Sequence, residues 1–342
     1  MDSDEIDDAI DLAIDNAIPE LGLLICQKIS RRFIKAPIRT SQLPGKSYVN
    51  DVLNDNPRRS YEVLRMPKDV FNNLCHWFTM HQLLKPSCKG VGVEEQVMMF
   101  MAIVGHGFSN RQVQERYQHS GETVSRHFNC VLDACLHLYR EFVRLPANVT
   151  PVYVHGNPKF HPYFEKCIGA IGGSHIDAFV KEEEAFRFRN RKGTLTQNVL
   201  AACDFELRFC YILAGWEGSA QDAHVLSDAV TRGFTAPEGF YYLADAGYAC
   251  AKGLLTPYRG VCYHLKKANL QPQNAAELFN LRHVLLRNAI ERTFGVFKRR
   301  FKVMATGSGY PIRIWFWRVQ QYITLFVSTP IILILRFRTW RI

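Results

Sequence analysis

Two patterns of apolar residues divide the chain. In residues 46–145 apolar side chains recur every three or four positions, a spacing that predicts amphipathic helices. After four prolines within 146–162, short apolar runs such as 167–171 and 240–244 are typical of buried strands. A long basic helix is expected over about 283–301. Strands combined with helices predict an α/β domain behind a helical one.

These patterns predict four regions along the chain. They are an acidic arm over 1–45, expected to be disordered or to form a short amphipathic helix; a helical domain over 46–145; an α/β domain over 146–310; and an atypical basic-apolar segment over 311–342.

Residues 109–138 have the layout of a helix-turn-helix. Ser109 is expected to cap a short helix over 110–117, and a second helix is expected to begin at Glu122 after a glycine turn. An ordinary helical hairpin fits the spacing equally well. If the motif binds DNA, the residues expected to point outward at the start of its second helix are Thr123, Ser125 and Arg126.

The net charge and its distribution along the chain indicate the class of partner. The chain has 42 Lys and Arg against 32 Asp and Glu, a formal net charge of +10. Residues 1–20 hold eight acidic side chains and no basic one, whereas 281–342 hold twelve basic side chains and one carboxylate, Glu291. A basic body predicts a polyanionic partner, with nucleic acid first and an anionic membrane surface second.

Composition excludes other classes. The hydrophobic share of 47% excludes global disorder. The ten cysteines include no CxxC pair, and without a secretory signal at the start they are expected to be free thiols in a reducing compartment. The longest apolar run, 322–335, is shorter than the roughly 20 residues that span a bilayer. A buried core segment is expected there, with a tail anchor as the minor alternative, and no membrane is among the expected partners.

Two carboxylates are candidates for chemistry. Glu291 is a lone acid on a basic helix, which suits either a divalent metal shared with a phosphate or an ion pair with Arg287 or Arg292. Asp245 follows a buried strand, where ligands gather in open α/β sheets, although an Asp there also starts turns. The first strand ends before Gly172, so it supplies no third acid.

The order of several motifs resembles that of Harbinger-type transposases and the nucleases derived from them. The matching stretches are SNRQVQERYQHSGETVSRHFNCVL (109–132), CIGAIGGSHI (167–176), RNRKGTLTQNVLAACDFELRF (189–209), LAGWEGSAQDAHVL (213–226), YYLADAGY (241–248) and RNAIERTFGVFKRRF (287–301).

The resemblance implies an RNase H-like core, a mixed sheet flanked by helices, with a DDE triad that hydrolyses DNA phosphodiesters using Mg²⁺ or Mn²⁺. Asp245 and Glu291 take the second and third catalytic, metal-binding positions, while the first falls on Gly172. Because glycine has no side-chain oxygen, cleavage is expected to be weakened or lost. By the same resemblance, four residues are expected to support the site without replacing the missing acid: His175, Asp222, His224 and Asn288.

DNA is the partner that the resemblance implies. Seven basic residues are expected to follow its backbone, although the first four also suit a solvated turn: Arg187, Arg189, Arg191, Lys192, Lys298, Arg299 and Arg300. A Myb-like companion, an oligomer of this chain, and a nuclear or additionally cytoplasmic location are further expectations. The alternative is a domesticated, non-catalytic DNA-binding or partner-binding protein, which would also explain why 315–342 lacks the family's Leu-His-Asn pattern.

Overall fold

The computed structural model describes residues 3–33, 38–88, 90–261 and 271–307. The chain divides into two compact units, 1–42 and 43–342. The atypical segment 311–342 lies outside the described residues.

The first unit contains helix α1 (Ser3–Phe33). Its side chains from 13 to 29 are exposed, among them Ile14 and Ile18. The structure thus has a long helix where the sequence favoured a disordered arm. Isoleucines at every fourth position, from Ile6 to Ile18, are compatible with that helix.

The second unit begins with a helical region. Its helices are α2 (Gly45–Asn54), α3 (Pro57–Leu64), α4 (Lys68–Met80), α5 (Val93–His106), α6 (Asn110–Tyr117) and α7 (Gly121–Phe142). Helix α5 lies at the centre, with most of its side chains buried. Phe100 of α5 packs on Phe128 of α7 with ring centroids 5.1 Å apart. The expected helices are therefore present, and their apolar core is continuous with residues of β1 and α11.

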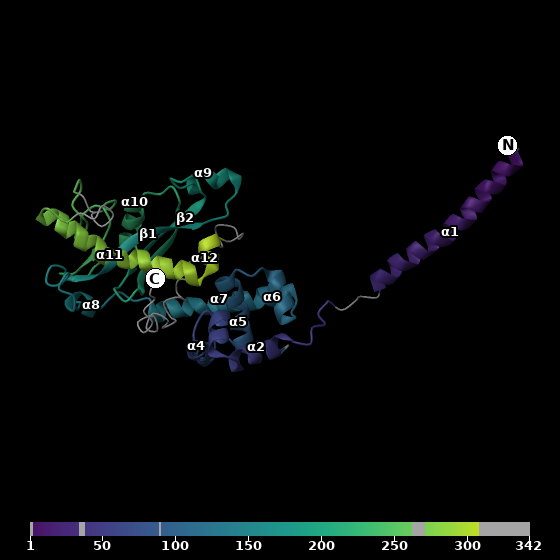
Figure 1. Cartoon of the computed structure of the whole chain (residues 1–342), viewed down its shortest axis with the longest axis horizontal. Coiled ribbons are helices and arrows are strands. Elements are labelled where there is room, and N and C mark those ends of the chain that lie inside the picture. Colours follow the sequence, from purple (N-terminus) through teal and green to yellow (C-terminus); the bar gives the residue numbers. More distant parts are fainter. Residues whose placement is uncertain (1–2, 34–37, 89, 262–270, 308–342) are drawn as a thin grey trace. The chain divides into compact units, whose positions relative to one another are not determined.

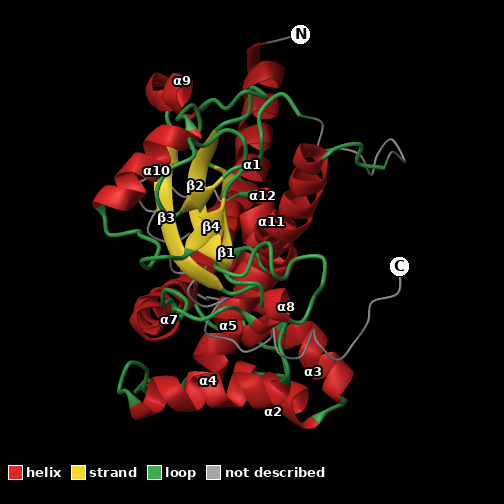
Figure 2. Cartoon of the chain, turned by 90° about the vertical axis from the view of Figure 1, so that its left-hand side faces the viewer, coloured by secondary structure: helices red, strands yellow, loops and turns green. Residues whose placement is uncertain are grey.

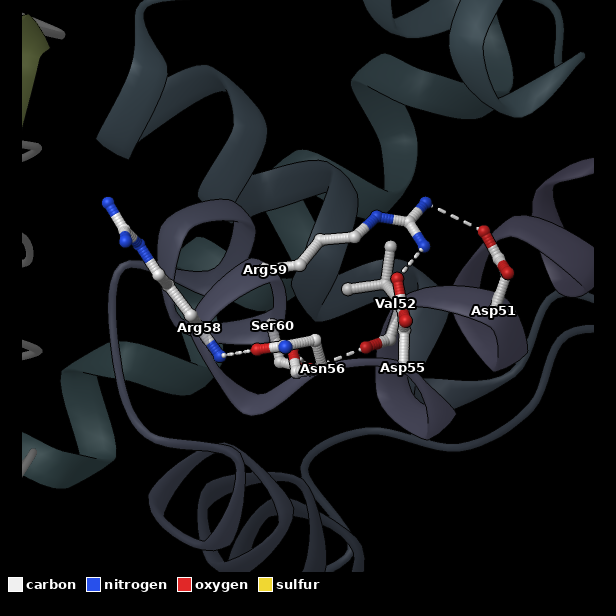
Figure 3. A network of polar contacts seen from close by, with 7 residues as sticks. All are labelled: Asp51, Val52, Asp55, Asn56, Arg58, Arg59 and Ser60. Carbon is white, nitrogen blue, oxygen red and sulfur yellow. Dashed lines mark hydrogen bonds and ion pairs between the residues drawn. The ribbon is translucent and has the colours of Figure 1, made fainter.

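Polar contacts fix the corner between α2 and α3 (Figure 3). The hydroxyl of Ser60 donates to the backbone oxygen of Val52 at 2.6 Å. Arg59 forms ion pairs with Asp51, at 2.7 Å, and with Asp55. The side chain of Asn56 caps α3 by accepting a hydrogen bond from the Arg58 backbone N–H at 2.8 Å. This bond stabilises the start of a helix that is only eight residues long.

Helices α6 and α7 confirm the expected helix, turn and helix in sequence order. Ser109 caps α6 in a reciprocal capping box with Gln112. Thr123, however, is buried, and its hydroxyl lies 2.8 Å from the Ser120 hydroxyl at the start of α7. The expectation that Thr123 points outward is wrong, whereas Ser125 and Arg126 are exposed.

A five-stranded mixed sheet forms the second half of this unit. Its strands are β1 (Cys167–Asp177), β2 (Thr196–Cys203), β3 (Phe209–Glu217), β4 (Tyr241–Leu243) and β5 (Leu254–Leu255). They lie in the order β3-β2-β1-β4-β5. Strand β1 is antiparallel to β2 and parallel to β4. The α/β prediction is confirmed by this sheet and the helices that flank it.

The remaining helices connect or cover the strands. They are α8 (Val152–His155), η1 (Glu182–Glu184), α9 (Ala185–Phe188), α10 (Asp222–Thr231), α11 (Ala275–Arg300) and α12 (Lys302–Thr306) (Figure 1). No described helix is long and apolar enough to cross a membrane.

Helices α10 and α11 cover opposite faces of the sheet (Figure 2). Alternating residues of β1 face the two layers: Ala170 joins the core that includes α11, and Ile171 joins the core that includes α10. Strand β1 continues past its predicted end at Ile171 because Gly172 and Gly173 pair with β2. Every second residue beyond Ala170 therefore faces α11.

The nine cysteines within the described ranges are free, as the sequence predicts, and five of them are buried. Burial raises the pKa of thiols such as Cys135 and Cys167. Cys262 lies outside the described residues.

Candidate functional site

Asp245 stands directly beyond β4, after Ala244. Its Oδ1 accepts a hydrogen bond from the Gly247 backbone N–H at 2.7 Å, so the interpretation of Asp245 as a turn-forming residue is confirmed. The same bond orients the carboxylate at the carboxyl end of a central strand, which is where ligands bind in open α/β sheets.

Asp245 shares a cavity of about 460 Å³ with a second carboxylate, Asp222. The other lining residues are Arg191, Gln221, Ala223, Ala246, Gly247, Pro257, His283, Val284 and Arg287. Asp222 begins α10, where the positive end of the helix dipole favours a negative charge. The structure thus brings Asp222, expected only to support the site, next to Asp245.

The side chain of Asp222 is held from the sheet. Asn198 of β2 donates from Nδ2 to Asp222 Oδ1 at 3.2 Å. Asn198 is 1% exposed, so its amide has few rotamers available and fixes the carboxylate to which it donates.

Glu291 does not line this cavity. Its Oε1 lies 3.1 Å from Arg287 Nη1, one helical turn earlier on α11, and its side chain is 54% exposed. The ion-pair alternative for Glu291 is therefore confirmed. Across the part of the chain that the structure describes, no group of three or more His, Cys, Asp or Glu residues is arranged to hold a metal ion.

Gly172, which the resemblance aligns with the first acid of the triad, lies on the face of β1 that packs against α11. A Cβ atom at Gly172 would lie 3.2 and 3.3 Å from the side chain of Ile290 and 3.9 Å from Arg287 Nη1. A carboxylate here would approach α11 as the resemblance implies. Because the position has no oxygen and Glu291 is paired, the residues present do not fit a DDE metal site with three carboxylates.

The other residues expected to support the site are dispersed. His175 is exposed at the end of β1 and its Nδ1 lies 3.0 Å from the Thr196 hydroxyl. Burial of part of the ring, more than any neighbouring charge, lowers the pKa of His175. His224 and Asn288 are exposed and do not line the cavity.

The basic stretch after β1 is exposed, with one ion-paired member. Arg187 is paired with Glu217, and Arg189 donates to the Gly193 carbonyl at 2.9 Å. Arg191 lines the cavity and Lys192 follows it on the surface. Arg191 therefore places positive charge at the edge of the carboxylate cavity.

The basic end of α11 has three different environments. Lys298 donates to the His175 carbonyl at 2.7 Å, and burial lowers the Lys298 pKa. Arg299 is exposed. Arg300 lies over the Tyr61 ring at 5.8 Å, and its Nε and Nη2 are buried with no described partner. Arg300 thus contacts α3 while remaining partly exposed, and the expected DNA contact stays a prediction.

His283 is a cavity residue that the sequence analysis missed. It is fully buried, and its Nε2 lies 2.9 Å from the Leu255 carbonyl. Burial is the main reason that its pKa falls to about 4. The sequence contained one signal for His283: it precedes Arg287 by one helical turn, so the two side chains share a face of α11.

A mixed sheet with a strand-end aspartate, covered by a helix that carries a glutamate and a basic end, is consistent with the fold of a DDE nuclease domain. Residues 173–328 match the family model described as DDE superfamily endonuclease, which supports a transposase-like nuclease domain in this chain. Residues 40–137 match a domain of unknown function, DUF8040. No curated protein and no solved structure matches the chain.

Proposed function

We propose that this chain is a Harbinger-type, transposon-derived DDE protein that binds DNA and cleaves it weakly or not at all. The observation that carries the proposal is Gly172, which faces Ile290 and Arg287 where the resemblance requires an aspartate. The match of 173–328 to the DDE endonucleases supports the class of reaction.

The chemistry at issue is phosphodiester hydrolysis. In sites of this kind divalent cations activate water and stabilise the charge of the leaving oxygen, and side-chain oxygens hold the ions in place. Gly172 removes one such oxygen, and Arg287 already neutralises Glu291. We therefore assign no cleavage step to a metal bound at these three positions.

Cleavage assays test the proposal directly. The purified full chain is incubated with plasmid and linear DNA in Mg²⁺ or Mn²⁺, beside Gly172→Asp. We expect little or no cutting by the unaltered chain and more by Gly172→Asp. Gly172→Ala is the matched control, because it adds the same Cβ contact with Ile290 without a carboxylate. Equal cleavage by the unaltered chain and Gly172→Asp would contradict the proposal.

DNA binding is proposed to use the exposed basic residues near the cavity and the start of α7. The expected DNA contacts with exposed side chains are Ser125, Arg126, Arg187, Arg189, Arg191, Lys192 and Arg299. Because phosphate contacts release counterions, affinity should fall steeply as salt rises. The double variant Arg191→Ala/Lys192→Ala should reduce the log–log salt slope by about 2, whereas Lys159→Ala, an exposed lysine before β1, should leave it unchanged.

The alternative, a domesticated DNA-binding or partner-binding protein without catalysis, is favoured by the same Gly172. Cleavage in Gly172→Asp alone would support a degenerate nuclease, and cleavage in neither variant with intact DNA binding would support the alternative. Absence of DNA binding at low salt would contradict both.

The acidic arm carries a separate part of the proposal. Its negative charge suits a basic companion, and we include a Myb-like protein, nuclear location and self-association as parts of the proposed function. Co-purification with and without residues 1–42, which form a unit of their own, tests the companion contact. Cell fractionation tests the nuclear location, and light scattering of the purified chain tests self-association.

A further inference from the structure

Helix α1 exposes a stripe of large apolar side chains. Neither of the two hydrophobic cores among the described residues includes a residue of this helix. Along α1, apolar residues follow one another at intervals of three or four positions, and each is 49–61% exposed: Ile14, Ile18, Leu21, Ile25 and Ile29. Residues at this spacing share one face of a helix. An exposed apolar surface of this kind marks a site that another molecule covers.

The stripe is symmetric about a point between residues 19 and 20. Its apolar residues form pairs whose members lie at equal distances on the two sides of this point: Ile10 with Ile29, Ile14 with Ile25, and Ile18 with Leu21. If two copies of α1 lie antiparallel with their midpoints together, the members of each pair come to the same height along the two helices. Pro19, the proline inside the helix, is next to this midpoint, so a bend there would divide both helices into matching halves.

The charges of α1 are opposite on the two sides of the same midpoint. The first 20 residues contain eight acidic side chains and no basic one, whereas residues 21–33 contain three basic side chains and no acidic one. Each basic residue has an acid at the same distance on the other side: Lys28 with Asp11, Arg31 with Asp8, and Arg32 with Asp7. Antiparallel copies therefore place unlike charges at the same height, whereas parallel copies in register would place like charges together.

A second copy of this chain fits both halves of the helix. A uniformly basic partner would be attracted by the acidic half and repelled by the basic end, and a uniformly acidic partner would meet the reverse. A second copy offers a basic segment to the acidic half and an acidic segment to the basic end. The geometry points to an antiparallel pair of α1 helices, one from each of two copies, with a two-fold axis between residues 19 and 20.

This inference deepens the self-association included in the proposed function, because it names the surface and the orientation of the two copies. It does not rest on DNA binding or cleavage. Residues 1–42 form a compact unit of their own, so substitutions in α1 can be tested in the full chain without altering the core of the second unit.

The experiment measures the oligomeric state of the full chain without DNA, by sedimentation velocity over a range of protein concentrations. We expect a dimer. Leu21→Asp should weaken it by about tenfold or more, because each copy then brings a carboxylate into the apolar stripe. Leu23→Asp is the matched control: Leu23 is as exposed as Leu21, at 63% against 61%, but lies on the opposite face of the helix.

Charge reversal tests the orientation of the helices. One triple variant reverses the basic end: Lys28→Glu, Arg31→Glu and Arg32→Glu. At low salt it should weaken the dimer by about tenfold, because acidic segments then lie beside each other, and the effect should shrink as salt rises. Affinity should return when three acids are also reversed in the same chain: Asp7→Lys, Asp8→Lys and Asp11→Lys. Circular dichroism confirms that each variant keeps its helical content.

Three results would overturn the inference. A full chain that stays monomeric and binds polylysine would assign α1 to the basic companion. A dimer that Leu21→Asp leaves unchanged would place self-association on another surface, and the proposed self-association would stand. A dimer that the reversed basic end leaves unchanged would exclude the antiparallel orientation. A failure of DNA binding, with a dimer that responds as expected, would instead count against the proposed DNA-binding function alone.

Discussion

Arg287 and Glu291 form an ion pair one turn apart on α11, with Nη1 3.1 Å from Oε1. The arginine is 16% exposed and the glutamate 54% exposed at the side chain. The pair therefore joins a cavity-lining arginine to a more exposed acid, and it compensates the charge of Glu291 near the basic end of α11.

This pair should contribute little to stability. Because solvent screens an exposed carboxylate, a double-mutant cycle with Arg287→Gln and Glu291→Gln should give a coupling of about 0.5 kcal/mol. Urea denaturation of the four proteins measures it. A coupling above about 2 kcal/mol would mean that the pair behaves as a buried one.

Crowding by Ile290 should determine how much a side chain at position 172 lowers the free energy of unfolding. A Cβ there would lie 3.2 Å from Ile290, so Gly172→Ala should lower the free energy of unfolding by about 1 kcal/mol. In an Ile290→Ala background the loss should be smaller, because both γ-carbons that the added Cβ would approach are removed. Equal losses in both backgrounds would show that Ile290 does not limit the position.

Gly169 should tolerate substitution far less. A Cβ at Gly169 would lie 2.2 Å from the backbone oxygen of Cys203, and a backbone atom in a central strand cannot move aside cheaply. Gly169→Ala should therefore cost about 3 kcal/mol or more. Gly295→Ala, on a helix with nothing within 4 Å, should instead stabilise the chain by about 0.5–1 kcal/mol. Thermal unfolding compares the two, and similar effects would contradict the strand geometry.

His127 should make stability depend on pH. It is 4% exposed, its Nε2 has no partner in the described structure, and burial lowers its pKa below 6.5. Below pH 6.5 the unfolded state takes up a proton that the folded state excludes, so stability falls as pH falls from 6.5 toward the folded pKa, by at most about 1.4 kcal/mol per pH unit.

His127→Leu removes this group and should flatten the slope between pH 7 and 5 while leaving stability at pH 8 little changed. Urea unfolding of both proteins at several pH values measures the difference. An unchanged slope in the variant would assign the dependence to other groups.

Local signals predicted most of the elements. Ser109 with Gln112 has the spacing of a capping box, and the structure forms that box at the start of α6. The start of α10 at Asp222 and the strand before Asp245 were also predictable from the order of apolar and polar residues. These features depend on neighbours within a few residues, which a sequence displays directly.

The sequence by itself determined the α/β class, the net positive charge, and the glycine at position 172, because these depend on residue type and order. Only the tertiary structure decided that Asp222 meets Asp245 while Glu291 pairs with Arg287. These pairings depend on the packing of α10 and α11 on opposite faces of one sheet. Successive residues of β1 point to opposite faces, so they contact one helix or the other. Arg300 shows the same limit, since its Nη1 lies 3.5 Å from the hydroxyl of Tyr61, 239 residues away in the sequence.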